Sequence, residues 1–498
     1  MFLFLSLILF FSTYLFFRRN KIFIRKVQAK KYPPGPKKLP LIGNLHQMGN
    51  LLPHQSFQQL SEKYGPIMFL ELGSIQTLVV SSADLAKEIF KTHDVIFSGR
   101  PALYAAKKFS YNCASVSFTP YGDHWREIRK IMIMELLSAK RVQTFVAIRD
   151  EEVGVLLQTI ARSSRSRSSV NLSDLLISLA NNIVCLVAFG KKFENGESRF
   201  SEMLHETQDL LGGFCMADFF PWLSWLNKWN GLEMRVEKCF KELDNLYDKV
   251  IEEHLDPKRP NKAEHEDVVD ILLQVQKDPR QAIALNNDQI KGVLTDIFIA
   301  GSDSSAAALE WIMAELIKNP SVMKKAQEEV REVAKGKGKV LEKDLSKLNY
   351  LKLVIKEGLR FHPPVPLLVP RETTESCIID GWQVPSKTRV FFNAKAIGRD
   401  PKSWEDPNEF RPERFLDSSV DLKGQHFEFL PFGAGRRGCP GINFAMLLIE
   451  LALANLLCRF DWELPHGVKR EDLDMEEAFG LTMHKRIPLC LDATIVDQ

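Results

Sequence analysis

The stretch PFGAGRRGCPG, residues 431–441, places a single cysteine, Cys439, in a loop that is rich in glycine and arginine. The apolar run that follows it, residues 442–457, is typical of a buried helix. Glycines allow backbone N–H groups to approach a neighbouring atom closely, and the N-terminus of a helix favours the thiolate form of a cysteine. The stretch therefore predicts a thiolate that can bind a metal ion.

Two other interpretations of this loop are open. Gly433, Gly435 and Gly438 match the G-x-G-x-x-G fingerprint of dinucleotide-binding proteins. That fingerprint needs an acidic residue about 20 positions later, and Leu453 and its neighbours stand there instead. The chain beyond the loop is also too short for a nucleotide-binding half. The second alternative, a cysteine with a purely structural role, is not excluded by the loop alone.

Length and composition indicate a large globular protein. The chain has 498 residues, of which 45% are hydrophobic and 26% charged, and no segment repeats at a fixed period, which argues against a solenoid. Residues 1–31 hold seven of the 66 basic side chains and no acidic one, so the remainder carries 59 basic and 63 acidic groups. This slightly acidic remainder argues against a nucleic-acid partner.

The eight cysteines are scattered along the chain without paired spacings. Such sparse usage is unlike a disulfide framework and indicates a reducing compartment. The C-x-x-C and H-E-x-x-H patterns of zinc sites do not occur in the sequence, which argues against zinc.

Residues 2–17 form an almost wholly apolar run. As a helix this run spans about 24 Å, close to the ~27 Å hydrocarbon core of the endoplasmic-reticulum membrane. Basic residues follow the run instead of preceding it, and no small-residue cleavage site is present, which favours an uncleaved membrane anchor over a cleaved signal peptide. The positive-inside rule then places the rest of the chain in the cytosol.

The sequence accordingly divides into three parts. Residues 1–24 form the predicted transmembrane anchor, and residues 25–36 form a basic hinge that ends in Pro33-Pro34-Gly35-Pro36. Such a proline run cannot be helical and acts as a stiff connection, although an ordinary surface linker would look the same. Residues 37–498 form the predicted folded domain.

The folded part is predicted to be mainly α with a small β region that is split along the sequence. Helical periodicity covers residues 83–92, 122–134, 139–161, 173–189, 233–254 and 268–276. The polar stretches 162–169 and 255–267 are predicted loops. Residues 67–80 predict a hairpin around Gly73-Ser74, and a strand pattern returns over residues 378–392.

Residues 289–318 are free of proline and predict one long helix. Any of the three residues 286–288 (Asn-Asn-Asp) could cap its start. In its middle, Asp303 and Ser304 interrupt an apolar run, and an acid beside an alcohol can relay protons. The alternative is a loop that joins two helices, with Gly301 as the break.

Two further pairs of residues fall on one helix face each. Glu357 and Arg360 are three positions apart in a predicted helix over residues 346–361, and Arg414 could join them. Trp125 and Arg129 are four positions apart and could together bind a carboxylate. Such pairs are also common on surface helices, so neither carries an assignment alone.

Taken together and in this order, the motifs resemble the haem-thiolate monooxygenases of the cytochrome P450 family, in particular its membrane-anchored plant members of specialised metabolism. Residues 432–441 match the family signature F-x-x-G-x-R-x-C-x-G at every fixed position, and the resemblance extends over nearly the whole chain. It implies a cytochrome P450-like fold with one N-terminal membrane anchor helix. It also makes residues 37–498 a haem-binding catalytic domain.

The resemblance implies a role for each motif. Cys439 becomes the axial ligand of the iron in haem b, in a loop that begins at Phe432. The positions that match haem propionate ligands are Trp125, Arg129, Arg371 and Arg437. Glu357, Arg360 and Arg414 match a buried ion network that supports the cysteine loop.

Asp303 and Ser304 match the acid–alcohol pair that delivers protons during oxygen activation in this family. The family usually has threonine where Ser304 stands. Serine keeps the hydroxyl but lacks the methyl group that stiffens the side chain. The sequence therefore predicts looser proton delivery and more uncoupling.

The segments that match the family's substrate pocket are overwhelmingly apolar and imply a lipophilic or aromatic substrate, although core packing explains each of them as well. They are residues 111–118, Phe298, Ala300, residues 365–369 and residues 479–481.

The implied activity inserts one oxygen atom of O₂ into a small lipophilic metabolite at the cytosolic face of the endoplasmic reticulum. Electrons would come from NADPH through NADPH–cytochrome P450 reductase, with cytochrome b5 as a second candidate partner. One alternative is a redox-partner-independent isomerase or dehydratase of the same fold, against which Asp303 and its neighbouring hydroxyl argue. The other is a catalytically silent haem-binding membrane protein.

Overall fold

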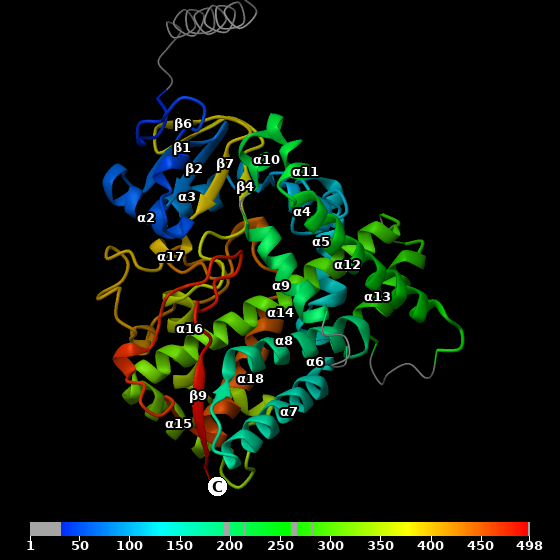
Figure 1. Ribbon diagram of the computed structural model, residues 1–498, viewed down its shortest axis with the longest axis vertical. Coiled ribbons are helices and arrows are strands. Elements are labelled where there is room, and N and C mark those ends of the chain that lie inside the picture. The colour runs from blue at the N-terminus through cyan, green and yellow to red at the C-terminus, as the bar shows by residue number, and fades with distance from the viewer. Residues whose placement is uncertain (1–30, 194–198, 214, 260–265, 281–282, 497–498) are drawn as a thin grey trace, which may run out of the picture.

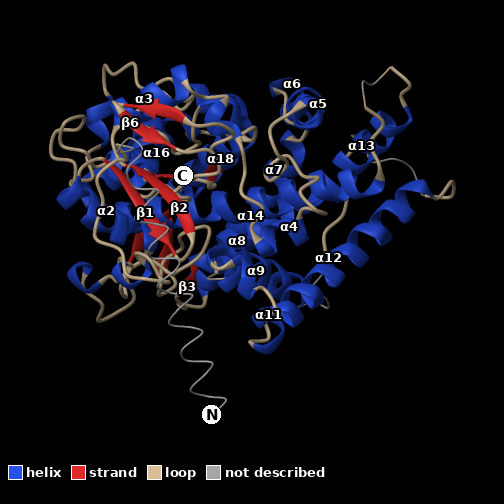
Figure 2. Ribbon diagram, turned by 90° about the horizontal axis from the view of Figure 1, so that it is seen from above, coloured by secondary structure: helices blue, strands red, loops and turns tan. Residues whose placement is uncertain are grey.

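Helices dominate this computed structural model, which describes residues 31–193, 199–213, 215–259, 266–280 and 283–496 (Figure 1). The predicted anchor, residues 1–24, lies outside the described residues, as do residues 25–30 of the predicted hinge. Seen from above, the strands gather on one side of the molecule, and α12 (Leu232–Leu255) and α13 (Val268–Lys277) lie on the other (Figure 2). The mainly α fold with a small β region is confirmed.

The β region brings together segments that are far apart in the sequence. The predicted hairpin is confirmed as β1 (Ile67–Leu72) and β2 (Ile75–Val80), which pair antiparallel. β7 (Arg389–Phe392) adds to β2 in parallel, and β4 (Arg371–Glu372) pairs with β7, so the order is β1-β2-β7-β4. The sheet therefore holds Arg371 on its far edge strand.

Two smaller sheets complete the β structure of the described chain. β5 (Cys377–Ile379) and β6 (Trp382–Val384) pair antiparallel around a turn at Asp380-Gly381, at the start of the predicted strand region 378–392. β9 (Cys490–Ile495) pairs with both β3 (Val170–Asn171) and β8 (Phe460–Glu463). This second arrangement was not predicted, because its strands β3 and β8 have only two and four residues and carry little periodic signal.

The long helix α14 (Asn287–Lys318) crosses the middle of the protein (Figure 1). Asn286 caps it, in a capping box with Gln289. The helix does not break at Gly301, so the alternative of two helices is wrong. A Cβ atom on Gly301 would lie 3.0 Å from Val184 Cγ2, which shows that glycine serves close packing against α8 (Leu172–Phe189).

The other helices surround this centre. Those not yet given are α2 (Pro53–Tyr64), α3 (Ala83–Thr92), α4 (Tyr104–Phe109), α5 (Asp123–Ile131), α6 (Ala139–Thr144), α7 (Val146–Arg165), α9 (Arg199–Gly212), α10 (Met216–Phe219), α11 (Leu226–Trp229), α15 (Pro320–Ala334), α16 (Asn349–Phe361), α17 (Ala394–Ile397) and α18 (Ile442–Arg459). The prediction lacked α2, α4, α9 and α15 and the three short helices α10, α11 and α17.

Three predicted boundaries are corrected by the structure. The predicted helix 139–161 is two helices, α6 and α7, which meet at Phe145. α7 continues to Arg165, so half of the predicted loop 162–169 is helical, since no glycine or proline ends the helix earlier. The predicted helix 122–134 changes at Met132 from α to a π-helical turn over Met132–Leu136.

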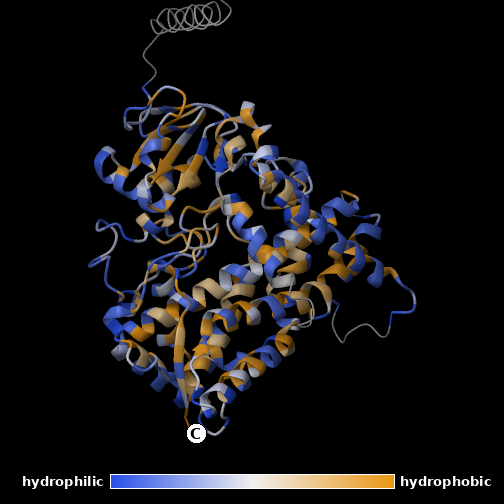
Figure 3. Cartoon of the chain, viewed as in Figure 1, coloured by the Kyte–Doolittle hydropathy of each residue, from blue (hydrophilic) through white to orange (hydrophobic). Residues whose placement is uncertain are grey.

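The main hydrophobic core surrounds α8, α14 and α18. In Figure 3 the outer helices show hydrophilic residues beside hydrophobic ones, as amphipathic helices do. Among the described residues, α8 and α18 are long and apolar enough to cross a membrane, but 61% of each is buried inside the protein, as in core helices. Their hydrophobicity therefore fits core packing.

Candidate functional site

A mostly apolar cavity of about 300 Å³ lies beside the middle of α14. Several segments line it: Ser115–Phe118 before α5, Ala300, Ser304 and Ala308 of α14, Val365, Leu368 and Val369, Phe432 and Cys439, and Leu481. Three of the predicted pocket segments thus meet here, together with Ala300. Phe298 does not join them, because it packs in the core at 6.2 Å from the ring of Phe189.

Cys439 is accessible from this cavity. Its backbone N–H donates to Phe432 O at 2.9 Å, and the N–H of Gly441 donates to its Sγ at 3.3 Å. Burial raises the pKa of the Cys439 thiol, while the Gly441 N–H and the charge of Arg129 lower it. A bound cation would add to these two effects and deprotonate the thiol.

The glycines of the loop hold it close to its neighbours. Gly435 has a φ of 66°, and a Cβ there would lie 2.3 Å from Asp94 Oδ1. The same carboxylate accepts from the N–H of Arg436 at 3.0 Å and lies 3.1 Å from its guanidinium. Glycine is therefore required at position 435.

Four arginines that lie near one another line the cavity: Arg100, Arg129, Arg371 and Arg437. Backbone carbonyls hold each of them. Arg129 donates to Gly438 O at 2.5 Å, Arg371 donates to Ala434 O at 2.7 Å, and Arg437 donates to Thr119 O at 2.6 Å. These bonds orient the guanidinium groups but supply no negative charge.

The arginines carry more positive charge than the surrounding acids neutralise. Burial and mutual repulsion lower the pKa of Arg437 to about 9, and burial lowers the pKa of Arg371 to about 10. The nearby acids are Asp94, which lies 3.4 Å from Arg371, and Asp296. Such an excess of guanidinium groups at an apolar cavity fits an anionic ligand with two carboxylates. The residues present therefore fit a haem group with its propionates.

Trp125 contacts this arginine cluster through its ring. The centroid of its ring lies 4.3 Å from the guanidinium of Arg437 and 5.4 Å from that of Arg129. Its indole N–H, expected from the sequence to reach a carboxylate, donates to Val116 O at 3.0 Å. Trp125 thus packs against two of the arginines that line the cavity, and its binding of a carboxylate stays a prediction.

Two residues of the site were missed by sequence reasoning. Arg100 donates to Ser117 O at 2.9 Å and to Val369 O at 2.6 Å. Asp296 accepts from the N–H of Ser117 at 3.1 Å, and burial raises its pKa to about 6. Asp296 could have been noticed as a charged residue in the mostly apolar run 293–299, a signal that identifies a buried polar group but not its partners, whereas Arg100 stands in no such run.

Asp303 and Ser304 point in different directions. Ser304 lines the cavity, and its hydroxyl donates to Ala300 O at 2.8 Å. Asp303 is buried on another side of the helix, where its Oδ1 lies 2.9 Å from His484 Nε2. Ser305 is also buried beside the cavity, and its hydroxyl has no hydrogen-bond partner among the described residues.

Glu357, Arg360 and Arg414 form a buried ion network. Arg360 donates to both carboxylate oxygens of Glu357, at 2.7 and 2.8 Å, and Arg414 donates to one of them at 3.0 Å. Arg360 also holds the carbonyls of Gly398 and Pro407. The network thus ties α16 to the segment that leads toward the cysteine loop.

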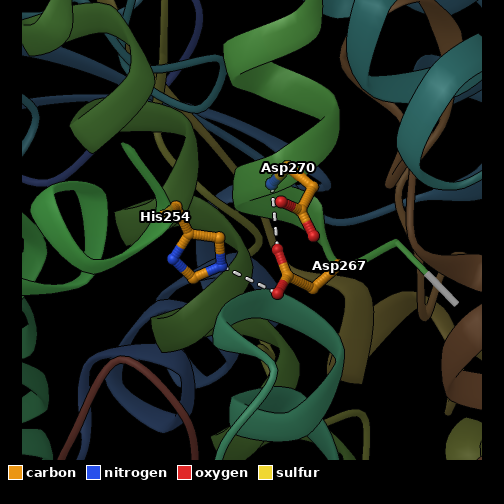
Figure 4. Close-up of side chains that lie close together, drawn as sticks. All are labelled: His254, Asp267 and Asp270. Carbon is orange, nitrogen blue, oxygen red and sulfur yellow. Dashed lines mark hydrogen bonds and ion pairs between the residues drawn. The ribbon is translucent and has the colours of Figure 1, made fainter. Parts of the chain in front are cut away.

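A second cluster of possible metal ligands joins the end of α12 to the start of α13 (Figure 4). His254 Nε2 lies 2.8 Å from Asp267 Oδ2. Arg259 lies 3.1 Å from Asp267 and 2.9 Å from Asp270. Because the arginine already pairs with both carboxylates, the cluster is an ion-pair network between two helices.

A comparison with known families decides the identity of the fold. A model of the family Cytochrome P450 matches residues 33–490. The chain belongs to the cytochrome P450 family. Haem iron is therefore its cofactor, in agreement with the fit of the arginine cluster and Cys439 described above.

Similar P450s come from plants. A soybean protein, cytochrome P450 71A9 (Glycine max), is 63% identical over 95% of both chains. Strychnine-11-hydroxylase from Strychnos nux-vomica is 58% identical over 94% of this chain and 92% of its own length. The similarity to these plant proteins indicates that this P450 is an oxidative haem enzyme.

Solved P450 structures share the fold. A zebra fish cytochrome P450 with abiraterone has a TM-score of 0.75 at 26% identity, covering 89% of this chain and 100% of its own. The same holds for a zebra fish P450 structure with progesterone, at a TM-score of 0.74. The predicted P450 fold is thereby confirmed.

Proposed function

We propose that this P450 inserts one oxygen atom of O₂ into a small lipophilic plant metabolite, with electrons from NADPH through NADPH–cytochrome P450 reductase. The observation that carries the proposal is one apolar cavity that contains the thiol of Cys439 and the hydroxyl of Ser304. The space in which a substrate could bind is therefore next to a thiol that can bind iron and a hydroxyl that can carry protons.

The haem would be held by residues that line the cavity. Cys439 would bind the iron, and Arg100, Arg129, Arg371 and Arg437 would bind the propionates. Bound in this way, haem supplies the activation of dioxygen, which a thiolate ligand favours. The N–H of Gly441 near Sγ and the carbonyl of Phe432 fix the position of the cysteine.

Ser304 and Asp303 would supply protons. The Ser304 hydroxyl bonds Ala300 O within the helix and borders the cavity, so it can pass a proton to a water or oxygen there. Asp303 is the preceding residue of the helix and lies buried on another side of it. Its carboxyl group would exchange the proton with Ser304 from the protein interior. The pair supports monooxygenation over a reaction without external electrons.

Ser304→Ala should raise the hydrogen peroxide released per NADPH oxidised, because a positioned proton donor typically contributes about 10²-fold or more to its step. The measurement uses the full-length enzyme reconstituted with reductase. Ser304→Thr is the matched control, since it restores the methyl group usual in the family and should lower peroxide release. An unchanged peroxide ratio in Ser304→Ala would remove Ser304 from the relay.

The substrate class follows from the cavity and from relatives. The lining is mostly apolar, which favours a lipophilic molecule. Two relatives are named for strychnine and norfluorocurarine, at 58% and 43% identity, which supports a plant specialised metabolite.

Screening such metabolites for substrate-induced shifts of the haem spectrum would identify the compound. If no lipophilic compound shifted the haem spectrum, this substrate class would be contradicted.

An exposed apolar surface supports a location at the endoplasmic-reticulum membrane. It consists of Leu41, Ile42, Trp222, Trp225 and Trp229. Backbone bonds join its two parts, since Gly73 N–H donates to Ile42 O at 3.2 Å and Ser74 N–H donates to Phe219 O at 2.9 Å. Tryptophans on a surface of this kind favour the membrane–water interface.

Replacing Trp222, Trp225 and Trp229 together by serine should weaken vesicle binding by about tenfold or more, because each buried aromatic side chain contributes roughly 1.5 kcal/mol or more. The measurement is the partition of residues 31–498 onto vesicles of endoplasmic-reticulum lipid composition. Leu416→Ser with Ile487→Ser, which removes exposed apolar side chains elsewhere, is the control and should bind like the parent. Equal losses in both variants would contradict a membrane role of the tryptophan surface.

The redox partners would dock over the cysteine loop. Arg126, Lys130 and Arg436 are exposed basic side chains on or next to the segments that hold the haem site. They suit an acidic partner such as the reductase or cytochrome b5. Charge reversal of these three residues should raise the KM for reductase at low ionic strength, and the increase should shrink as salt is added. An unchanged KM at low ionic strength would place the docking surface elsewhere.

A further inference from the structure

His484 connects the C-terminal segment to two acidic residues of α14. Its Nε2 lies 2.9 Å from Asp303 Oδ1, and its Nδ1 lies 3.3 Å from Glu310 Oε2. The carboxylates are only 6% and 3% exposed, whereas 21% of the histidine side chain reaches solvent. A protonated imidazole donates from both nitrogens, so it can satisfy both acids at once.

The same segment borders the cavity. Leu481 and Thr482 line it, and the next residue, Met483, accepts the indole N–H of Trp311 at 2.8 Å. Lys485 donates its backbone N–H to Glu310 Oε2 at 3.1 Å. His484 is therefore held in place from both sides, two positions from a residue that a ligand would touch.

The charges around His484 favour its protonated form. Burial lowers the pKa of His484, but the hydrogen bonds and charges of Asp303 and Glu310 outweigh burial and raise it to about 10. The neighbouring cation, Lys485, turns its Nζ toward the ring of Trp311 and the carbonyl of Asp474. The imidazolium thus faces two carboxylates from α14 and remains charged at neutral pH.

We infer that His484 is a positioning residue that holds the carboxyl group of Asp303 in a fixed orientation beside a cation for proton delivery, an inference that rests on the proposed relay through Asp303 and Ser304. A buried carboxylate that loses its cationic partner is driven toward its neutral form. His484 therefore supplies the cationic partner of the relay acid over the pH range in which the histidine itself stays charged.

The test is the pH dependence of hydrogen peroxide released per NADPH oxidised, in the full-length enzyme reconstituted with reductase and without added substrate. In the wild type this ratio should stay flat between pH 6.5 and 9, because His484 stays protonated there. In His484→Gln the ratio should rise at least about twofold toward the acidic end, because low pH favours the neutral form of a buried acid that has lost its cationic partner. An inflection in the wild type, or a flat profile in His484→Gln, would overturn the inference.

Two further variants separate positioning from simple structural support. His484→Arg restores a cation that can bond both carboxylates and should return the flat profile. His362→Gln breaks a histidine–carboxylate bond of 2.7 Å to Glu315 on the same helix, away from Asp303. It should lower thermal stability while leaving the profile flat. A sloping profile in both His362→Gln and His484→Gln would mean that loss of stability alone causes the slope.

Asp303→Asn distinguishes failure of this inference from failure of the proposed relay. If Asp303→Asn raises peroxide release but His484→Gln leaves the profile flat, the relay stands and the role of His484 is wrong. If Asp303→Asn itself behaves like the wild type, the proposed relay is wrong and His484 has no relay acid to position.

Discussion

Cys439→Ser should abolish the red-shifted Soret band of the reduced, carbon-monoxide-bound protein, which is the signature of thiolate ligation. The hydroxyl of serine does not ionise at neutral pH and binds haem iron poorly, so the whole band should disappear. The geometry supports this choice of ligand, because Cys439 is the thiol that both opens into the cavity and has a backbone N–H, that of Gly441, at 3.3 Å from its sulfur.

Cys377→Ser serves as the matched control. Cys377 lies partly buried in β5, away from the cavity lining. This variant should keep the full band, which excludes a general effect of removing a thiol. If Cys439→Ser also kept the band, Cys439 would not be the iron ligand.

Glu357→Gln should have the second largest effect, on folding and haem loading instead of on chemistry. Glu357 and Arg360 are fully buried, and the variant leaves both Arg360 and Arg414 without their shared carboxylate. Breaking a buried ion pair by removing one partner costs about 3–5 kcal/mol. Chemical denaturation should show a loss of this size, and the haem content per protein should fall with it.

The control for this variant is Glu405→Gln. Glu405 pairs with Arg411 in the same region at 2.7 Å, but the carboxylate is largely exposed. Exposed ion pairs contribute about 0–1 kcal/mol, so stability and haem content should stay close to the wild type. Similar losses in both variants would show that the buried network has no special role.

Residues with a strong local pattern were predicted well from the sequence. α3 begins and ends at the predicted residues, because Ser82 caps it and its apolar face is regular. The hairpin of β1 and β2 was found from its alternation and from Gly73. Gly301 was ambiguous, because only the packing of Val184 shows that its missing side chain serves helix contact instead of a helix break.

The residues of the candidate site that belong to a sequence motif could be predicted. Cys439 and the pair Glu357 and Arg360 were found from the spacing of neighbouring residues. Their roles were inferred from the resemblance to the P450 family. Arg100 and Asp296 depend on contacts with the loop at Ser117, and His484 lies 181 positions from Asp303. No local sequence pattern indicates a contact between residues so far apart, so these residues could be identified only from the three-dimensional structure.

Isotope labelling of the product is the decisive test of monooxygenase activity. The full-length enzyme, reconstituted with reductase and NADPH, would turn over a compound that shifts its haem spectrum, under ¹⁸O₂. A monooxygenase should place one ¹⁸O atom in each hydroxylated product, which should form only when NADPH and reductase are both present. A product without ¹⁸O, or one formed equally without NADPH, would contradict a monooxygenase.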